Sequence, residues 1–368
     1  MMKRNSLGLL VCLGLLMSLF MGQPEHLFTK KKKVKLVQNT PAKQRLEWFA
    51  QHQVLKKKSP FKLLKWKFIG PDIISGRITD VEAHPKNKHV IYAGAATGGV
   101  WKTENSGTTW NPIMDDVASI SIGDIAISAS QPDTVWVGTG EANIFRASVA
   151  GVGIYKSLNG GKDWKHMGLE ETHTIARIVI HPTNPDIVYV AASGNEWTVN
   201  PERGLYKTVD GGITWKKIFY LNQSTGAIDL IMHPEDSQTL IVSMWNRTRK
   251  RWSDPVPGPG DGIFKTIDGG KTWEALTSGL PDNRFSGRMG IGISRSNPRV
   301  VYVLVDNHEA GRKPGAGELD SYGRLLKKAK IKGAEVYRSD DGGESFVKVS
   351  KNNAMMERLL STYGWVFG

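Results

Sequence analysis

Short apolar runs alternate with polar residues along most of the chain, and glycine-rich turns separate them. One example is the run 204–208 (GLYKT), the turn 209–213 (VDGGI) and the run 214–219 (TWKKIF). Apolar, aromatic and hydroxyl residues in this order favour strands. Asp-Gly-Gly supplies the positive φ angles of a tight turn. The pattern therefore predicts a β-hairpin.

The same hairpin pattern occurs five times, which makes it an internal repeat. The repeats close on Trp110, Trp164, Trp215, Trp273 and Phe346, which are 51 to 73 residues apart. Four strand-like runs fill each repeat; in the third they are 176–180, 187–191, 204–208 and 214–219. Repeats of this length with four strands each indicate an all-β chain folded as a β-propeller with five complete blades.

One acid or amide stands at the same place in every turn: Asn105, Asn159, Asp210, Asp268 and Asp341. Its side chain can accept hydrogen bonds from the turn amides, so we expect a structural role. Length varies between repeats mostly in the loop between the second and third strands: 95–99, 139–153, 193–203, 245–262 and 306–334. Insertions on one end of a repeat array usually mark the working end. We therefore expect a ligand there and not at the turns.

The net charge of +14 is concentrated near the N-terminus. Residues 1–67 hold 15 of the 49 Lys and Arg but 2 of the 35 Asp and Glu, so the rest of the chain is nearly neutral. This distribution argues against a nucleic-acid-binding domain. The basic segment is suited to weak electrostatic contact with a membrane. The sequence does not specify an oligomeric state.

The chain divides into three predicted parts. Residues 1–22 have a basic start and an apolar run, as a secretory signal does, which predicts a secreted or periplasmic protein; a retained membrane anchor is the alternative. Residues 23–65 form a basic linker with a helix over 41–55, in which Leu46, Phe49, Ala50 and Gln53 share one face. Residues 66–368 form the propeller. The segment 66–70 looks like an outer strand without its blade, so we expect the propeller to be incomplete at its C-terminus.

Charged residues occupy one register of the inner strands. Alignment of these strands places Asp80, Asp124, Arg177 and Asp229 at equivalent positions, which should ring the central channel. They form either a hydrated, partly paired channel or the floor of a ligand site. Close carboxylates around one arginine would shift one another's pKa values.

The long loops supply further candidate ligand-binding residues: Glu141, Arg146, Trp197, Arg203, Trp245, Arg247 and Trp252. Tryptophans beside charged groups suit the apolar faces and hydroxyl edges of sugars or the side chains of a peptide; packing within the loops is the alternative. We expect Asp124, Glu141, Arg146 and Arg177 to form one cluster. Replacement of Glu141 or Arg177 by alanine should then weaken binding by more than about tenfold with little effect on stability.

Cofactor and metal sites are not indicated. His84, His181 and His233 each precede a turn residue on a different blade, so they should not converge on a metal. The single cysteine, Cys12, lies in the N-terminal apolar run. The chain has no P-loop, and 138–140 (GTG) lacks the third glycine of a dinucleotide fingerprint.

The repeated S/T-x-D-G-G-x-T-W pattern resembles the Asp-box, or BNR, repeat of sialidases, sortilin-type receptors and propeller glycosidases. The resemblance covers about residues 66–350 and is nearest to secreted bacterial proteins of the sortilin-like and glycosyl-hydrolase-like kind. It implies that the boxes are hairpins far from any active site. Xyloglucan-hydrolysing propellers carry a catalytic Asp before Gly-Gly in the first repeat, and Ala96 stands at that position here. The expected general base is therefore missing.

These observations favour a module that binds a peptide or a glycan. The alternative is a glycoside hydrolase, which needs two carboxylates about 5–10 Å apart across a cleft. A structural scaffold is the third interpretation.

Overall fold

The computed structural model describes residues 39–64, 76–143, 148–248, 256–319, 325 and 331–351. The chain divides into two compact units, Met1–Asn39 and Thr40–Gly368. The predicted signal, the basic run before residue 39 and the predicted outer strand 66–70 lie outside the described residues. No helix among the described residues is long and apolar enough to cross a membrane.

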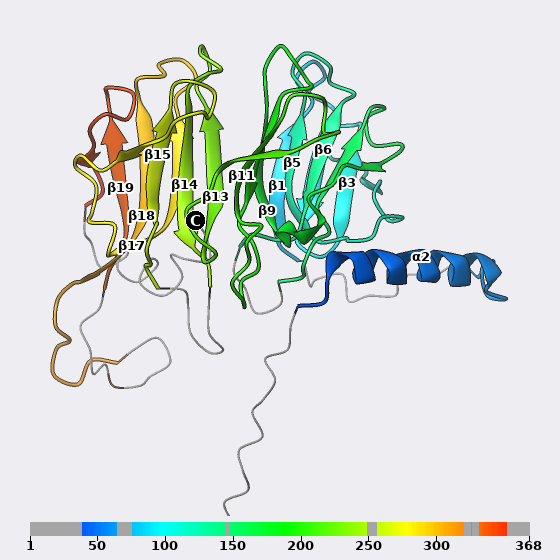
Figure 1. Ribbon diagram of the computed structural model, residues 1–368, viewed down its shortest axis with the longest axis horizontal. Helices are drawn as coiled ribbons and strands as arrows, with labels where there is room; N and C mark the ends of the chain where they lie inside the picture. Colours follow the sequence, from blue (N-terminus) through cyan, green and yellow to red (C-terminus); the bar gives the residue numbers. More distant parts are fainter. Residues whose placement is uncertain are drawn as a thin grey trace, which may run out of the picture. The chain divides into compact units, whose positions relative to one another are not determined.

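In the part of the chain that the structure describes, twenty strands form five antiparallel sheets, and within each sheet the strands pair in chain order (Figure 1). Sheet 1 comprises β1 (Ile78–Ala83), β2 (Ile91–Ala95), β3 (Gly99–Thr103) and β4 (Asn111–Pro112). Sheet 2 comprises β5 (Ile122–Ile127), β6 (Val135–Thr139), β7 (Ile154–Ser157) and β8 (Lys165–His166). Sheet 3 comprises β9 (Ile175–Ile180), β10 (Val188–Ala192), β11 (Gly204–Thr208) and β12 (Lys216–Phe219).

Sheet 4 comprises β13 (Thr225–Met232), β14 (Leu240–Asn246), β15 (Gly262–Thr266) and β16 (Glu274–Leu276). Sheet 5 comprises β17 (Ser286–Ile293), β18 (Val301–Ala310), β19 (Ile331–Ser339) and β20 (Val347–Lys348). The predicted all-β fold with five four-stranded repeats is confirmed. The first strands β1, β5, β9, β13 and β17 pack against one another in series, which is the arrangement of propeller blades around a channel.

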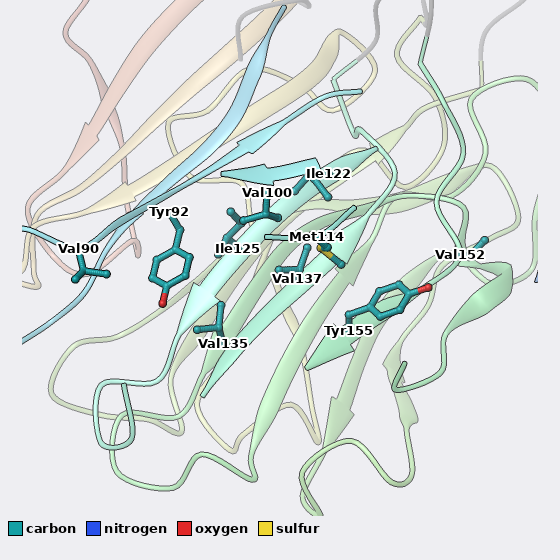
Figure 2. Packing of buried hydrophobic residues seen from close by; sticks show 10 residues of the cluster. All are labelled: Val90, Tyr92, Val100, Met114, Ile122, Ile125, Val135, Val137, Val152 and Tyr155. Carbon is teal, nitrogen blue, oxygen red and sulfur yellow. The ribbon is translucent and has the colours of Figure 1, made fainter. Parts of the chain in front are cut away.

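Apolar side chains fill the space between consecutive sheets. Figure 2 shows the cluster between sheets 1 and 2, in which Tyr92 and Val100 of sheet 1 meet Ile125 and Val137 of sheet 2. Strands such as β5 and β10 are almost wholly buried, because another sheet covers each of their faces. Their Val, Ile and Ala content follows from this burial.

The five Asp boxes share one hydrogen-bonded turn. In the third box, Thr208 Oγ1 donates to Asp210 Oδ1 at 2.7 Å, and the Thr214 N–H donates to the same oxygen at 2.9 Å. Gly211 and Gly212 have φ angles of 69° and 92°, which glycine adopts without strain. The structure places the other four predicted residues in equivalent turns: Asn105, Asn159, Asp268 and Asp341.

We expect Asp210→Ala to lower the melting temperature by about 2–4 °C. The hydrogen bonds from Thr214, and then the one from Thr208, hold the pKa of Asp210 well below its usual value. This stabilisation is present above the unfolded-state pKa and is lost as the pH falls through the folded-state pKa. Calorimetry at pH 7 and pH 3 should show a smaller difference from the wild type at pH 3. The exposed Glu235→Gln is the control, and an equal effect of both changes would contradict a turn role.

Hydrogen bonds show which of the loops that connect the strands lie together at each end of the sheets. Each Asp box meets the turn between the first and second strands: the Gly211 N–H donates to the Asp186 carbonyl at 3.0 Å. The loop between the second and third strands meets the connection from the preceding sheet: the Ser193 N–H donates to the Thr174 carbonyl at 3.1 Å. We call these the Asp-box end and the long-loop end, and the predicted separation of the two is correct.

The His-Pro histidines cap turns at the Asp-box end. Nδ1 of His84 accepts a hydrogen bond from the Lys86 N–H at 3.1 Å, and Nδ1 of His233 accepts one from the Asp236 N–H at the same distance. His181 does the same for Asn184 at 3.2 Å. These contacts give the three histidines a local structural role.

Helix α2 (Ala42–Lys58) runs three residues beyond the predicted helix, and Pro41 is its N-cap. Its first turn is tied to the sheets, since the Ala42 N–H donates to Glu171 Oε1 at 2.8 Å and Leu46 packs on the first apolar cluster. Glu171 belongs to the short helix η1 (Glu170–Thr172). Ala50, which we predicted on the packed face, is exposed.

Candidate functional site

A β-bulge stands beside the charged register of the inner strands. The pairing of β1 with β2 shifts between Ile78 and Asp80, and that of β5 with β6 shifts between Ile122 and Asp124. The same irregularity lies directly before Asp229 in β13. A bulge rotates the following side chain away from the regular alternation. It re-aims the register residues relative to the rest of their strands.

The aspartates of this register hold neighbouring sheets together. Asp80 Oδ2 accepts the Ile125 N–H at 2.9 Å, so sheet 1 is joined to sheet 2. Asp124 Oδ2 accepts the Ile178 N–H at 2.6 Å. Asp229 Oδ2 accepts the Ile291 N–H at 2.9 Å, which joins sheet 4 to sheet 5. Each carboxylate therefore satisfies a backbone donor of the next inner strand.

Arg177 bridges the two aspartates on either side of it. Its Nη1 lies 3.1 Å from Asp124 Oδ1, and its Nε lies 3.2 Å from Asp229 Oδ1. The negative charge of Asp124, and then that of Asp229, raises the pKa of the Arg177 guanidinium, which stays charged. The predicted register thus forms an ion-paired array across sheets 2, 3 and 4.

A polar cavity of about 120 Å³ lies beside this array, and all five inner strands contribute to its wall. Its lining includes Thr79, Asp124, Arg177, Asp229 and Arg288. Water-sized groups fit such a volume, so the cavity can admit one polar group of a larger ligand.

Arg288 in β17 is the cation of this cavity that is not held between two carboxylates. It is half-buried, and its Nη1 donates to Asn143 Oδ1 at 2.7 Å. Its guanidinium lies 5.8 Å from the ring centroid of Trp245. Burial lowers the pKa of Arg288 to about 10, so the side chain is charged at neutral pH. A guanidinium in this setting can bind a carboxylate or hydroxyl groups of a ligand.

Buried arginines fasten the long loops. Arg247 is 1% exposed, and it donates to the carbonyl oxygens of Ala142 at 2.9 Å, Glu141 at 3.0 Å and Gly194 at 2.6 Å. Arg203 is fully buried and donates to the Thr198 carbonyl at 3.1 Å. We predicted both as loop-surface residues, and the structure corrects this, because both side chains are buried and donate to backbone carbonyls.

Glu141 also differs from its prediction. It is fully buried and forms a bidentate ion pair with Arg77, whose Nε lies 2.7 Å from Oε1 and whose Nη2 lies 2.6 Å from Oε2. A carboxylate in this setting has little capacity left for a ligand. Replacement of Glu141 or Arg177 would break an ion pair with a buried carboxylate, so we now expect these changes to lower stability as well.

The structure brings together only part of the predicted site. Asp124, Arg177 and Asp229 share one array, whereas Glu141 pairs elsewhere. Trp197 stands in the long loop after β10 and is 46% exposed. Trp245 is 2% exposed in β14 and packs with Ala142, Ala176 and Ile228, so it cannot present its ring to a surface ligand. Arg146 and Trp252 lie outside the described residues.

Glu82, two residues after Asp80, has an altered acidity. Burial, and then the negative charge of Asp80, raise the pKa of Glu82 to about 7. Between about pH 4.5 and pH 7 the folded chain keeps a proton that the unfolded chain has released. Stability is therefore lost as the pH rises through this window.

We expect Glu82→Gln to stabilise the fold by about 1–2 kcal/mol at pH 8, after allowance for solvent screening. At pH 5 the difference should be much smaller, because Glu82 is then protonated in the folded chain. Urea unfolding at the two pH values measures both differences. The exposed Glu274→Gln serves as control. A gain of the same size at both pH values would contradict this account of Glu82.

A comparison with family models matches residues 153–330 to Sortilin-Vps10, described as sortilin, neurotensin receptor 3. The chain carries a sortilin/Vps10-like β-propeller. This resemblance agrees with the one that the Asp boxes suggest. The match covers sheets 3 and 4 and parts of sheets 2 and 5.

Relatives of this sortilin/Vps10-like propeller include two kinds of protein. The xyloglucanase Xgh74A of Acetivibrio thermocellus is 26% identical over 215 residues, which are 51% of this chain and 24% of that protein. The vacuolar protein sorting/targeting protein 10 of Colletotrichum graminicola is 33% identical over 106 residues, which are 28% of this chain and 6% of that protein. The chain spans about a quarter of the length of the xyloglucanases that it matches.

Among solved structures, an ancestral GH74 enzyme is similar, with a TM-score of 0.55 and 20% sequence identity. The match covers 77% of this chain and 32% of that one. At this identity the likeness establishes the propeller fold.

Proposed function

We propose that this sortilin/Vps10-like propeller is a binding module for a peptide or a glycan. The ligand would lie over the long-loop end of the channel and place one polar group against Arg288. We further propose that the protein acts in a secreted or periplasmic setting, in line with the signal-like N-terminus. The ligand is the only partner in this proposal, and no cofactor is required.

The observation that carries the proposal is the environment of Arg288. The cavity beside it is lined by all five inner strands, so its polar groups stand on rigid elements. Arg177 is engaged by two aspartates, whereas Arg288 contacts the neutral Asn143 and the ring of Trp245. A charged donor held on a strand, with a neutral partner, is suited to bind an anionic or hydroxyl group.

Glycan and peptide arrays, probed with the full chain, test the proposal. We expect a set of ligands that share a carboxylate or a dense pattern of hydroxyl groups to bind the wild type. The same set should bind Arg288→Gln weakly. Ligands retained equally by both proteins would place the binding site elsewhere, and the absence of any ligand on both arrays would contradict a binding module of this kind.

A glycoside hydrolase is the second candidate, and the similarity to xyloglucanases favours it. Glu82, with a pKa of about 7, is a carboxyl that can give up a proton near neutral pH. Against it stand Ala96 at the expected catalytic position and the engagement of Asp124 and Asp229 by Arg177. Release of reducing ends from xyloglucan, abolished by Glu82→Gln, would support the hydrolase; no release by the wild type would reject it.

A further inference from the structure

An aromatic ring fills the same place between sheets in the first three repeats. The ring belongs to the second residue of the second strand: Tyr92, Trp136 or Tyr189, each at most 1% exposed. The Tyr92 hydroxyl donates to the carbonyl of Gly160 at 3.1 Å, and the Tyr189 hydroxyl donates to that of Gly269 at 3.2 Å. Both acceptors are the first glycine of an Asp box in a following repeat.

A lysine of the third strand covers each of these rings. The Nζ of Lys102 lies 5.4 Å from the Tyr92 centroid, and those of Lys156 and Lys207 lie 4.9 Å from the rings of Trp136 and Tyr189. Each ammonium also donates to the Asp-box glycine of the next repeat, at 3.0–3.2 Å. The ring position therefore has two constant features, a cation on its face and a carbonyl at its rim.

The fourth repeat keeps these features but has Ile241 where the ring should be. Lys265 Nζ donates to the Gly342 carbonyl at 3.1 Å and contacts Glu344 Oε1 at 2.5 Å. A cavity of about 170 Å³ lies between sheets 4 and 5 at this place. Its lining is Ile231, His233, Thr239, Ile241, Lys265, Ile267, Ile293 and Gly342.

The glycines of the Asp boxes give an independent measure of this space. A Cβ on Gly160 would lie 3.4 Å from the Tyr92 hydroxyl, and one on Gly212 would lie 2.5 Å from Trp136, so the rings of the first two repeats reach the box that follows them. A Cβ on Gly342 would meet nothing within 4 Å, and one on Gly343 would be 3.4 Å from its nearest neighbour. The cavity therefore occupies the ring position of the fourth repeat.

We propose that this cavity binds a phenol or indole ring from outside the chain, supplied by a small molecule or by a peptide side chain. Its volume suffices, since an aliphatic cavity of about 150 Å³ accepts benzene. Four isoleucines would contact the ring, Lys265 would cover its face, and the Gly342 carbonyl would accept a hydrogen bond from its O–H or N–H. The site lies at the Asp-box end and does not depend on the proposed ligand at the long-loop end.

Titration of the full chain with p-cresol, followed by NMR, tests the proposal. We expect one saturable site with a dissociation constant of about 1 mM. The matched control 4-methylcyclohexanol has a similar shape and hydroxyl but no aromatic face, and it should bind about fivefold more weakly or worse. Equal binding of the two compounds, or no saturation by p-cresol, would overturn the proposal.

Two variants locate the site. Ile241→Tyr restores the residue of the first and third repeats, so it should abolish p-cresol binding and raise the melting temperature by about 2–4 °C. Undiminished binding to this variant would overturn the assignment.

Tyr189→Ile should create a second cavity of the same kind and raise the stoichiometry from one to two. If that variant does not fold, Lys265→Met replaces it, with affinity expected to fall by about threefold or more; unchanged affinity would overturn the role of the ammonium.

A second titration separates the two sources of the ring. N-acetyltyrosinamide carries the same phenol on a peptide backbone. Affinity within about threefold of p-cresol identifies a peptide side chain as the ligand, whereas much weaker binding restricts the site to small phenols. Binding of either compound requires the cavity of the wild type, so neither compound should bind to Ile241→Tyr.

Discussion

Arg177→Met is expected to lower the free energy of unfolding by about 2–4 kcal/mol at pH 7. The change removes the positive charge that Asp124 and Asp229 share, at 3.1 and 3.2 Å. The Asp124 side chain is 3% exposed, so its charge would stay in the interior with one amide hydrogen bond, from Ile178. Methionine keeps most of the volume of the arginine stem, which limits the effect of a cavity.

The same variant should be sensitive to pH. Burial already raises the pKa of Asp124 well above its usual value, against the opposing effect of the Arg177 charge. Without Arg177 this pKa would rise further, so the variant would be least stable when that carboxyl is charged. Its deficit should therefore shrink between pH 7 and pH 5. Urea unfolding at both values measures this, with Arg338→Met as control, since Arg338 is partly exposed and pairs with the exposed Asp340. A deficit that is equal at both pH values would contradict the ion-pair account.

Arg288→Gln should weaken ligand binding by about 10- to 100-fold, because a hydrogen bond to a charged group contributes about 1.5–3 kcal/mol. The fold should change little. The change removes one hydrogen bond to Asn143, and the stacking of the guanidinium on the Trp245 ring contributes only about 1 kcal/mol. Isothermal titration with a ligand found on the arrays, alongside thermal unfolding, measures both effects.

The matched control for this prediction is Arg284→Gln. Arg284 precedes the same strand, β17, but it is exposed and pairs with Asp282. We expect its replacement to leave affinity within about twofold of the wild type. If both variants bind equally weakly, the effect is one of general charge and not of the channel; if Arg288→Gln binds normally, the ligand does not reach the cavity.

Local features of the fold could be predicted from the sequence. The Asp-box turn depends on residues within a few positions of one another, such as Thr208, Asp210 and Gly212, so its hydrogen bonds follow from the motif. The register of Asp124, Arg177 and Asp229 could also be found, because repeats place equivalent residues around one axis. Both results rest on repetition, which the sequence displays directly.

Contacts between distant segments could not be predicted in the same way. Arg77 and Glu141 are 64 positions apart, and no motif connects them. Arg247 resembles an exposed loop arginine in the sequence, although its guanidinium group is fixed by carbonyls of other loops. Arg203 has the same appearance, but its guanidinium group is fixed by carbonyls of its own loop. The sequence predicts a loop that begins at Trp245, whereas β14 continues to Asn246. Trp245 therefore lies in a strand and not in a loop.

Arg288 could not be found from the register for a related reason. The fifth inner strand has Gly290 where the others have a charged residue, so the charged register stops there in the sequence. Arg288 lies two positions earlier, where the first three inner strands have isoleucine, and the irregular pairing of β17 with β18 falls beside it. An arginine at an otherwise apolar position was the signal in the sequence.

The central claim is that a ligand binds at the long-loop end and not at the Asp boxes. Hydrogen–deuterium exchange of the full chain, with and without a ligand from the arrays, tests it most directly. We predict slower exchange in residues 148–153 and 193–203, and no change in the Asp-box turns such as 208–214. Protection confined to the Asp-box turns, with the long loops unaffected, would contradict the account.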